Sequence, residues 1–566
     1  RIQRETMERN TLEIKYLYIT NGYLGIRVDE SYELLLPDST ATVRIVVDEG
    51  RQLQYGEKKI TGSYPEHFKF EFEKVIHELK DNVPINFFDV EAAAFELKTI
   101  LANDGYPYAN VAYNIDSVDH SELIPITFDI RSDSLVHFGE MNIEGDDKYP
   151  EYAARRELKI VPNDVYRRRT ILNSQQRLFE SGYFSTLQLV QSKESADRLR
   201  PDFTLKVRER KPRYVTVTTG AGQSEFKDLI WDFTTGFGKR NFFGSRRYDL
   251  LADYSFSLGH DVRLVQHRYR LRYTEPWFMG VRMPLVLTGQ WEPRLKDPVG
   301  DYKIESWSVS ISTLKKFGPR VRTNVGLEYE SIEISGVSDE LKEVIKQENG
   351  ISVRRNVYFS YRRDTRDNLF IPQWGSVTDF QSEHYGGVLG GDDNFNKLEG
   401  SWSKYQVTWP GWVAATRLKA GWVEAFGKSD VVPVNDRLYL GGANTIRGFR
   451  ENSLGPQGPE GDPIGANFTF IFNQEFRWRT IQIFQWVPVL KDLFRSLPLY
   501  QSLFFDMGNG YLNISDARLS SMAYSYGTGF QIVSPAGPIR IDYARVLETD
   551  DFDFDYRWHF TILYAF

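Results

Sequence analysis

The residues best suited to specific chemistry lie in one glycine-framed loop, Gly441-Gly442-Ala443-Asn444-Thr445-Ile446-Arg447-Gly448-Phe449-Arg450. A guanidinium group stays charged and presents a planar fork of donors that can bind carboxylates in a bidentate manner. Glycine beside the arginine lets the backbone pass close to a neighbouring surface. The pattern therefore predicts that Arg447 is held at a fixed place between two strands.

Motifs of enzymes and metal sites are missing from the sequence. There is no GxSxG, HExxH or GxxxxGK[ST] pattern, cysteine is absent, and the eight histidines lack ligand spacing. Asp392-x-Asn394-x-Asn396 is similar to a calcium loop, but Ser403 stands where a bidentate glutamate is needed, so a solvated turn is the better interpretation. We expect no enzyme activity, no metal ion and no cofactor.

Composition narrows the class of protein further. The chain has 566 residues, 41% of them hydrophobic and 14% aromatic, which is enough for more than one module. A formal charge of -7 argues against a nucleic-acid partner. No window of about 18 apolar residues exists, so the chain could cross a bilayer only as strands. It begins Arg1-Ile2-Gln3, which we interpret as a trimmed N-terminus.

The C-terminal 350 or so residues are dominated by long alternating segments. Between Val321 and Tyr329, one face is Val, Thr, Val, Leu and Tyr, and the other is Arg, Asn, Gly and Glu. Such segments are about ten residues long with aromatic residues near their ends, as in membrane barrels. Arginine-rich inner faces suit a hydrated lumen better than the dry core of a sandwich. We therefore predict an all-β transmembrane barrel.

Counting these segments gives sixteen strands, and an even number places both barrel ends on the same side. Of the connections, Ser338–Asn349 is expected to hold a short outer helix and Ile481–Leu497 an interfacial helix, while residues 427–464 form the longest outer loop. The expected strands span residues 214–222, 228–238, 246–257, 262–274, 282–292, 302–315, 320–333, 351–362, 375–386, 396–409, 414–426, 465–478, 498–507, 522–533, 537–547 and 556–566.

The N-terminal part contains an internal repeat. Tyr55–Gly62 recurs as Phe138–Gly145 in the pattern aromatic-Gly-Glu-x-x-Ile-x-Gly. Helical patterns at Val90–Ala102 and Thr170–Glu180 each end near a Gly-Tyr pair, and strands follow. Each unit thus comprises a strand, two helices and two strands. The expected domains are a partial module at 1–52, full modules at 53–134 and 135–212, and the barrel at 213–566 with loop 427–464 folded inward.

These modules resemble POTRA domains, the α+β repeats that precede barrels in the BamA/TamA superfamily of outer-membrane-protein assembly factors. Motifs of the barrel half are similar to the same superfamily, and Ile446-Arg447-Gly448-Phe449 looks like its (V/I)RGF signature. The others are Asn241–Gly244, Tyr273–Phe278, Arg363–Asn368, Phe505–Gly508, Gly537–Ala544 and the terminal Phe566.

The resemblance implies that the long loop folds inward and that Ile446, Arg447, Gly448 and Phe449 form a brace against the barrel wall. Its expected partners are Glu475 and Asp506 on strands twelve and thirteen. Alternation supports Glu475, since the aromatic residues of 468–478 take the opposite face. Whether Arg447 only stabilises the barrel or also moves during function is left open.

The function implied by the resemblance is insertion of unfolded outer-membrane proteins into outer-membrane lipid through a lateral seam between the first and last strands. The N-terminal modules would capture these substrates in the periplasm, and accessory periplasmic or lipoprotein subunits or an inner-membrane partner would assist. Glycines weaken the first strand's pairing, so we expect that seam to open. The seam residues are Val215, Val217, Gly220, Gly222, Trp558, Phe560, Ile562, Tyr564 and Phe566.

Three other functions fit parts of this pattern. A TamA-like translocation module for autotransporters or envelope lipids would share both halves. A two-partner secretion transporter, which passes a polypeptide through the lumen, usually has two modules and a plug helix. A passive diffusion channel has no use for tandem modules. At this point three questions stay open: whether the chain belongs to a BamA-like or a TamA-like branch, which substrates it takes, and how many modules the full protein has.

Overall fold

The chain forms two compact units, Arg1–Arg210 and Lys211–Phe566, in the computed structural model of the protein. The predicted boundary between the modules and the barrel falls within a few residues of this division. The structure describes residues 4–35, 40–115, 122–145, 148–192, 197–223, 229–258, 262–296, 303–336, 350–458, 461, 463–480, 499–534, 537–549 and 552–562.

The first segment of unit one contains a helix followed by an antiparallel pair of strands. These elements are α1 (Arg4–Ile19), β1 (Arg27–Leu35) and β2 (Thr40–Asp48). A helix followed by two antiparallel strands also ends the second segment.

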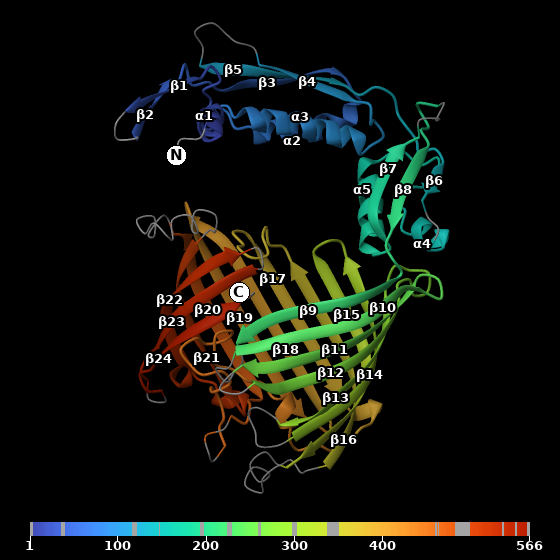
Figure 1. Ribbon diagram of the computed structural model, residues 1–566, viewed down its shortest axis with the longest axis vertical. Helices are drawn as coiled ribbons and strands as arrows, with labels where there is room; N and C mark the ends of the chain where they lie inside the picture. Colours follow the sequence, from blue (N-terminus) through green and yellow to red (C-terminus); the bar gives the residue numbers. More distant parts are fainter. Residues whose placement is uncertain are drawn as a thin grey trace. The chain divides into compact units, whose positions relative to one another are not determined.

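The second segment has a three-stranded sheet covered by two helices. Strand order is β3-β5-β4, with β3 parallel and β4 antiparallel to β5. Helices α2 and α3 lie together along one face of this sheet (Figure 1), and Phe72, Leu97 and Phe128 are fully buried between the layers. The elements are β3 (Gln54–Ser63), η1 (Glu66–Phe68), α2 (Lys69–Glu78), α3 (Phe87–Ala102), β4 (Asn110–Ile115) and β5 (Leu123–Arg131).

The third segment repeats this arrangement with strand order β6-β8-β7. The predicted helices Val90–Ala102 and Thr170–Glu180 lie within α3 and α5. The division of residues 1–212 into three domains remains a prediction, since contacts join residues 1–210 into one unit. The elements are β6 (Met141–Glu144), α4 (Glu151–Arg155), α5 (Arg168–Glu180), β7 (Phe184–Gln191) and β8 (Phe203–Glu209).

The second unit is a single sheet of sixteen strands in sequential order, which curls into a barrel (Figure 1). All its described pairings are antiparallel, and the predicted fold class and strand number are confirmed. The strands are β9 (Arg213–Gln223), β10 (Leu229–Phe242), β11 (Arg246–Leu258), β12 (Val262–Glu275), β13 (Leu285–Lys296), β14 (Lys303–Phe317), β15 (Val321–Ser335), β16 (Gly350–Asp364), β17 (Gly375–Tyr385), β18 (Phe395–Trp409), β19 (Trp412–Ala425), β20 (Phe468–Arg479), β21 (Leu499–Tyr511), β22 (Ala523–Ser534), β23 (Gly537–Val546) and β24 (Tyr556–Ile562). Short 3₁₀ turns are η2 (Gly387–Leu389), η3 (Val434–Asp436), η4 (Ile514–Asp516) and η5 (Leu519–Ser521).

The outer face of the barrel carries apolar and aromatic side chains. Val325 and Leu327 on β15 are about half exposed. Tyr269 and Trp291 face each other across β12 and β13 with ring centroids 5.5 Å apart, and Trp307 continues this band on β14. Aromatic bands of this kind are typical of strands that meet a membrane interface. No helix within the described ranges is long and apolar enough to span a bilayer.

Some predicted boundaries shift in the structure. Strand β20 starts at Phe468 rather than 465 because Ala466 instead bridges to Leu438 of the preceding loop. Strand β13 starts at Leu285 rather than 282, after a local turn that bridges Phe278 and Val281. The helices expected in Ser338–Asn349 and Ile481–Leu497 lie outside the described residues.

Candidate functional site

The loop between β19 and β20 carries the predicted brace motif. Its backbone bridges back on itself between Leu440 and Leu454. Ile446 is fully buried against Ile471 of β20 and Ala523 of β22, and half-buried Phe449 packs beside the same cluster. The apolar residues on either side of Arg447 therefore seat this part of the loop on the inner wall of the barrel.

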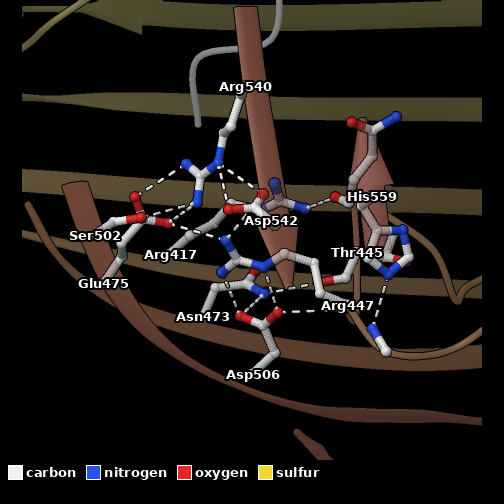
Figure 2. Close-up of polar contacts among 12 residues, drawn as sticks. Arg417, Thr445, Arg447, Asn473, Glu475, Ser502, Asp506, Arg540, Asp542 and His559 are labelled. Atoms are coloured by element: carbon white, nitrogen blue, oxygen red, sulfur yellow. Dashed lines mark hydrogen bonds and ion pairs between the residues drawn. The ribbon is translucent and has the colours of Figure 1, made fainter. Parts of the chain in front are cut away.

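Arg447 meets both of the carboxylates that were predicted as its partners (Figure 2). Its Nε and Nη2 donate to the two oxygens of Asp506 at 2.7 and 2.8 Å, and its Nη1 donates to Glu475 at 3.0 Å. Its backbone N–H also donates to Asp506, at 3.1 Å. The guanidinium carbon lies 3.4 Å from the ring centre of Phe504. Bidentate pairing and stacking together fix the plane of this guanidinium.

Glu475 is shared by three arginines. Besides Arg447, it accepts from Arg477 at 2.6 Å and from Arg540 at 2.9 and 2.8 Å. Arg540 also binds Asp542 with its Nε, and Arg447 and Arg540 lie one above the other with Glu475 and Asp542 between them (Figure 2). Three guanidinium groups thus face three carboxylates, so the buried charges compensate one another.

Strand alternation explains why these side chains converge. On β20, the inner face holds Asn473, Glu475 and Arg477, and on β21 it holds Phe504 and Asp506. Asn473 pairs with Asp506 across the two strands and donates to it at 2.8 Å. The register between β20 and β21 therefore brings the carboxylates that accept from Arg447 together independently of the loop.

Burial determines how strongly the charges interact. Arg447 is 4% exposed, and Glu475 and Asp506 are fully buried. Burial alone would lower the pKa of the Arg447 guanidinium, but Asp506 and then Asp542 raise it above its ordinary value. Arg447 therefore stays charged, and each carboxylate that it binds keeps a counter-charge.

Gly448 holds the loop close to the last two strands. Its φ of +96° lies in the left-handed region, and a Cβ there would stand 3.0 Å from Val546 Cγ2. Its N–H donates to Nε2 of His559 on β24 at 2.9 Å. The glycine thus gives both the backbone angle and the space that this hydrogen bond needs.

The predicted seam residues lie at the two ends of the sheet. Val215 and Val217 on β9 and Trp558 and Phe560 on β24 have exposed side chains. β9 pairs with β10 through Gly220 and Gly222 among others, and β24 pairs with β23, where Ile562 faces Ile539. Among the described residues, no pairing joins β24 to β9. Tyr564 and Phe566 lie outside the described residues.

Several residues of the site were not assigned a role from the sequence. They are Arg540 and Asp542 on β23, Phe504 on β21 and His559 on β24. Arg540, Asp542 and Ala544 alternate within a segment already recognised as a motif, so parity could have placed both charges in the lumen. His559 had no such signal, because a single histidine between Trp558 and Phe560 does not reveal what its ring contacts.

One carboxylate of the calcium-like segment binds a buried arginine. Asp393 accepts from Arg354 of β16 at 2.5 Å, and Arg354 also donates to Asp436 of the long loop at 2.7 Å. Arg354 is 1% exposed. The solvated-turn prediction concerned Asp392, Asn394 and Asn396; Asp393, which lies between them, is a counter-ion of this buried arginine.

Replacing Gly448 with alanine is expected to destabilise the barrel by about 1–3 kcal/mol because of the left-handed φ, with an added penalty for the contact with Val546. Gly427→Ala is the matched control, since Gly427 has a φ of +66° with no atom within 4 Å of a Cβ. Thermal unfolding of both variants measures the difference. Equal losses would contradict the close seating of Gly448 on the wall.

The fold and this site define a class of proteins: a sixteen-stranded barrel that follows small α+β modules and holds an arginine-braced loop in its lumen. The profile of the Omp85 superfamily domain matches residues 253–566, which is more than half of the chain, and the chain belongs to this superfamily. The POTRA profile, described as a surface antigen variable number repeat, matches residues 136–210. The resemblance inferred from the motifs is thereby confirmed.

Three curated relatives carry the name outer membrane protein assembly factor BamA. The protein of Nitratidesulfovibrio vulgaris is 24% identical over 97% of this chain and 66% of its own length. Those of Neorickettsia risticii and Neisseria meningitidis serogroup B are 23% and 22% identical over 96% of this chain and 70% and 71% of their lengths. This chain thus spans about two thirds of the length of these relatives.

The crystal structure of BamA from Haemophilus ducreyi lacking POTRA domains 1–3 is similar over 90% of this chain and 99% of that one. The TM-score is 0.63 at 18% identity, which supports the same fold. The matched relatives are named as assembly factors, in keeping with the prediction that the protein is not an enzyme.

Proposed function

We propose that this protein assembles β-barrel proteins in the bacterial outer membrane, with residues 1–210 in the periplasm. The observation that carries the proposal is the junction of the first and last strands: β9 and β24 end the sheet and lie near each other, but the described residues show no ladder between them. The superfamily and the names of the relatives agree with this function. The BamA-like branch is favoured over the TamA-like branch, because those relatives match nearly the whole chain.

The N-terminal modules offer edges that could capture an unfolded substrate. In the orders β3-β5-β4 and β6-β8-β7, the outer strands have a ladder partner on one side only among the described residues, apart from an isolated bridge between Gln54 of β3 and Pro84. An extended chain can add to such an edge through backbone hydrogen bonds, which depend little on its sequence. Substrates of varied sequence can therefore be held by the same modules.

The barrel seam offers a similar edge at membrane depth. In lipid, an unpaired strand edge is costly because no water satisfies its backbone groups. A substrate strand that pairs with β9 would satisfy these groups, and further strands could follow it into the bilayer. The sequence has no nucleotide-binding motif, so substrate folding and burial would supply the free energy. Accessory subunits are a proposal from the resemblance alone.

Reconstitution tests this function directly. The purified protein in lipid vesicles should accelerate the folding of a urea-unfolded outer-membrane barrel. The folded fraction is measured by protease protection and by the heat-modifiable electrophoretic mobility of the folded barrel. Vesicles containing a porin of similar size are the control for a barrel without modules. Equal folding rates in both kinds of vesicle would contradict the proposal.

A further inference from the structure

The terminal strand β24 has a ladder partner on one side only within the described chain. Its residues 556–562 pair with residues 539–545 of β23. The opposite edge shows no described ladder partner. Interactions of its inward side chains therefore contribute more to its position than they would for a strand paired on both sides.

His559 provides one such interaction. It lies on the inner face of β24, 8% exposed, between the exposed residues Trp558 and Phe560. Its Nε2 accepts the hydrogen bond from the N–H of Gly448, and both partners are buried. A ring nitrogen that accepts must be deprotonated, so this bond requires the neutral imidazole with its proton on Nδ1.

The donor of this bond is held in place by the arginine brace. Gly448 directly follows Arg447, whose backbone N–H and guanidinium both bind Asp506. Wall atoms of Val546, Ser525 and Ala544 lie 3.0–3.6 Å from the position that a Cβ on Gly448 would take. The direction of the Gly448 N–H is therefore set by the same contacts that seat Arg447.

The other end of the loop is fixed to a distant part of the wall. Arg354 of β16 binds Asp436, and Val434 and Ile464 pack with Ile332 and Ile334 of β15. These two isoleucines continue the inward face of β15 beyond its polar residues. The loop thus connects the wall at β15 and β16 with the terminal strand.

We propose that His559 is a positioning residue that couples the seating of the loop to the terminal strand. While Arg447 is seated, the Gly448–His559 bond restrains β24. Loss of the bond, or withdrawal of Arg447, frees the strand edge that forms one side of the seam. By reciprocity of coupled equilibria, displacement of β24 also weakens the seating of the loop. This inference rests on the proposed seam as the place where substrates enter.

Two substitutions at one position test the coupling. His559→Phe keeps an aromatic ring but removes the acceptor, leaving the Gly448 N–H buried without a partner. His559→Gln places an amide oxygen near the position of Nε2 and should restore the bond. Thr561→Val is the control, since it changes another inward polar group of β24.

The readout is hydrogen exchange of the full-length protein in lipid nanodiscs, without substrate. His559→Phe should accelerate exchange about tenfold in residues 556–562 and in residues 441–450 together, the scale of one lost buried hydrogen bond. Exchange in β16–β18 should not change. His559→Gln and Thr561→Val should both resemble the unmodified protein.

The reciprocal experiment uses Arg447→Ala, which should accelerate exchange in β24 as well as in the loop. Faster exchange confined to the mutated segment, or no change in either segment, would overturn the coupling. A protein that shows the coupled exchange but does not accelerate barrel folding in vesicles would contradict the proposed function and leave the coupling standing.

Discussion

Replacing Arg447 with alanine should lower the stability of the barrel by about 3–5 kcal/mol, because buried carboxylates lose a partner. Asp506 would lose both guanidinium bonds, and Glu475 would keep only Arg477 and Arg540. We expect the rate of barrel assembly in vesicles to fall at least about tenfold, since the loop no longer binds the wall. Thermal unfolding and the vesicle assay measure the two effects.

Arg450→Ala is the matched control, because Arg450 belongs to the same loop and is exposed. Arg447→Lys should lower stability and assembly rate less than Arg447→Ala and more than Arg450→Ala, since an ammonium keeps the charge but cannot bind Asp506 in the bidentate manner. Assays well below the unfolding temperature distinguish the two possible roles of Arg447. If Arg447 only braces the barrel, activity will stay proportional to the folded fraction; if it also moves during function, activity will fall further. An Arg447→Ala protein with unchanged stability and activity would contradict both roles.

A disulfide between β9 and β24 should abolish assembly and leave the folded barrel intact. The chain contains no cysteine, so an introduced pair is the only one present. Val217→Cys combined with Trp558→Cys or Phe560→Cys, whichever pair oxidises, would join two exposed positions of the seam. We expect at least about a tenfold loss of activity on oxidation, since the substrate edge stays closed, and recovery with a reductant.

The control disulfide joins strands that are already paired. Val217 faces Thr235 across β9 and β10, so Val217→Cys with Thr235→Cys closes no new edge. This pair should leave assembly unchanged in both redox states. If the β9–β24 disulfide also left assembly unchanged, entry of substrates through the seam would be refuted.

Much of this fold can be predicted from the sequence because lipid on one side and water on the other impose strict alternation. The segment Val321–Tyr329 shows the pattern, and β15 was placed within two residues at each end. Parity supported Glu475, since a change of one residue in register would turn it toward lipid, whereas Asp506 came from the family resemblance. The inward fold of the loop came from the family signature.

The parts of the site that could not be predicted depend on contacts between segments that are distant in the sequence. Arg354 meets Asp436 across 82 positions, and Gly448 meets His559 across 111. No local periodicity encodes such pairs, because they depend on how the loop crosses the lumen. The sharing of Glu475 among three arginines was missed for the same reason: Arg540 is four strands from the start of the loop in chain order.

The proposed function requires substrate strands to pair with β9, and trapping an assembly intermediate tests this pairing most directly. A stalled substrate with one cysteine in its last strand would be oxidised against single cysteines at Val217 on β9 and Leu327 on β15, both exposed outward positions. We predict a disulfide with Val217 that shifts in register as the substrate cysteine is moved by two residues, and none with Leu327. Equal crosslinking to both positions, or none to Val217, would contradict the account.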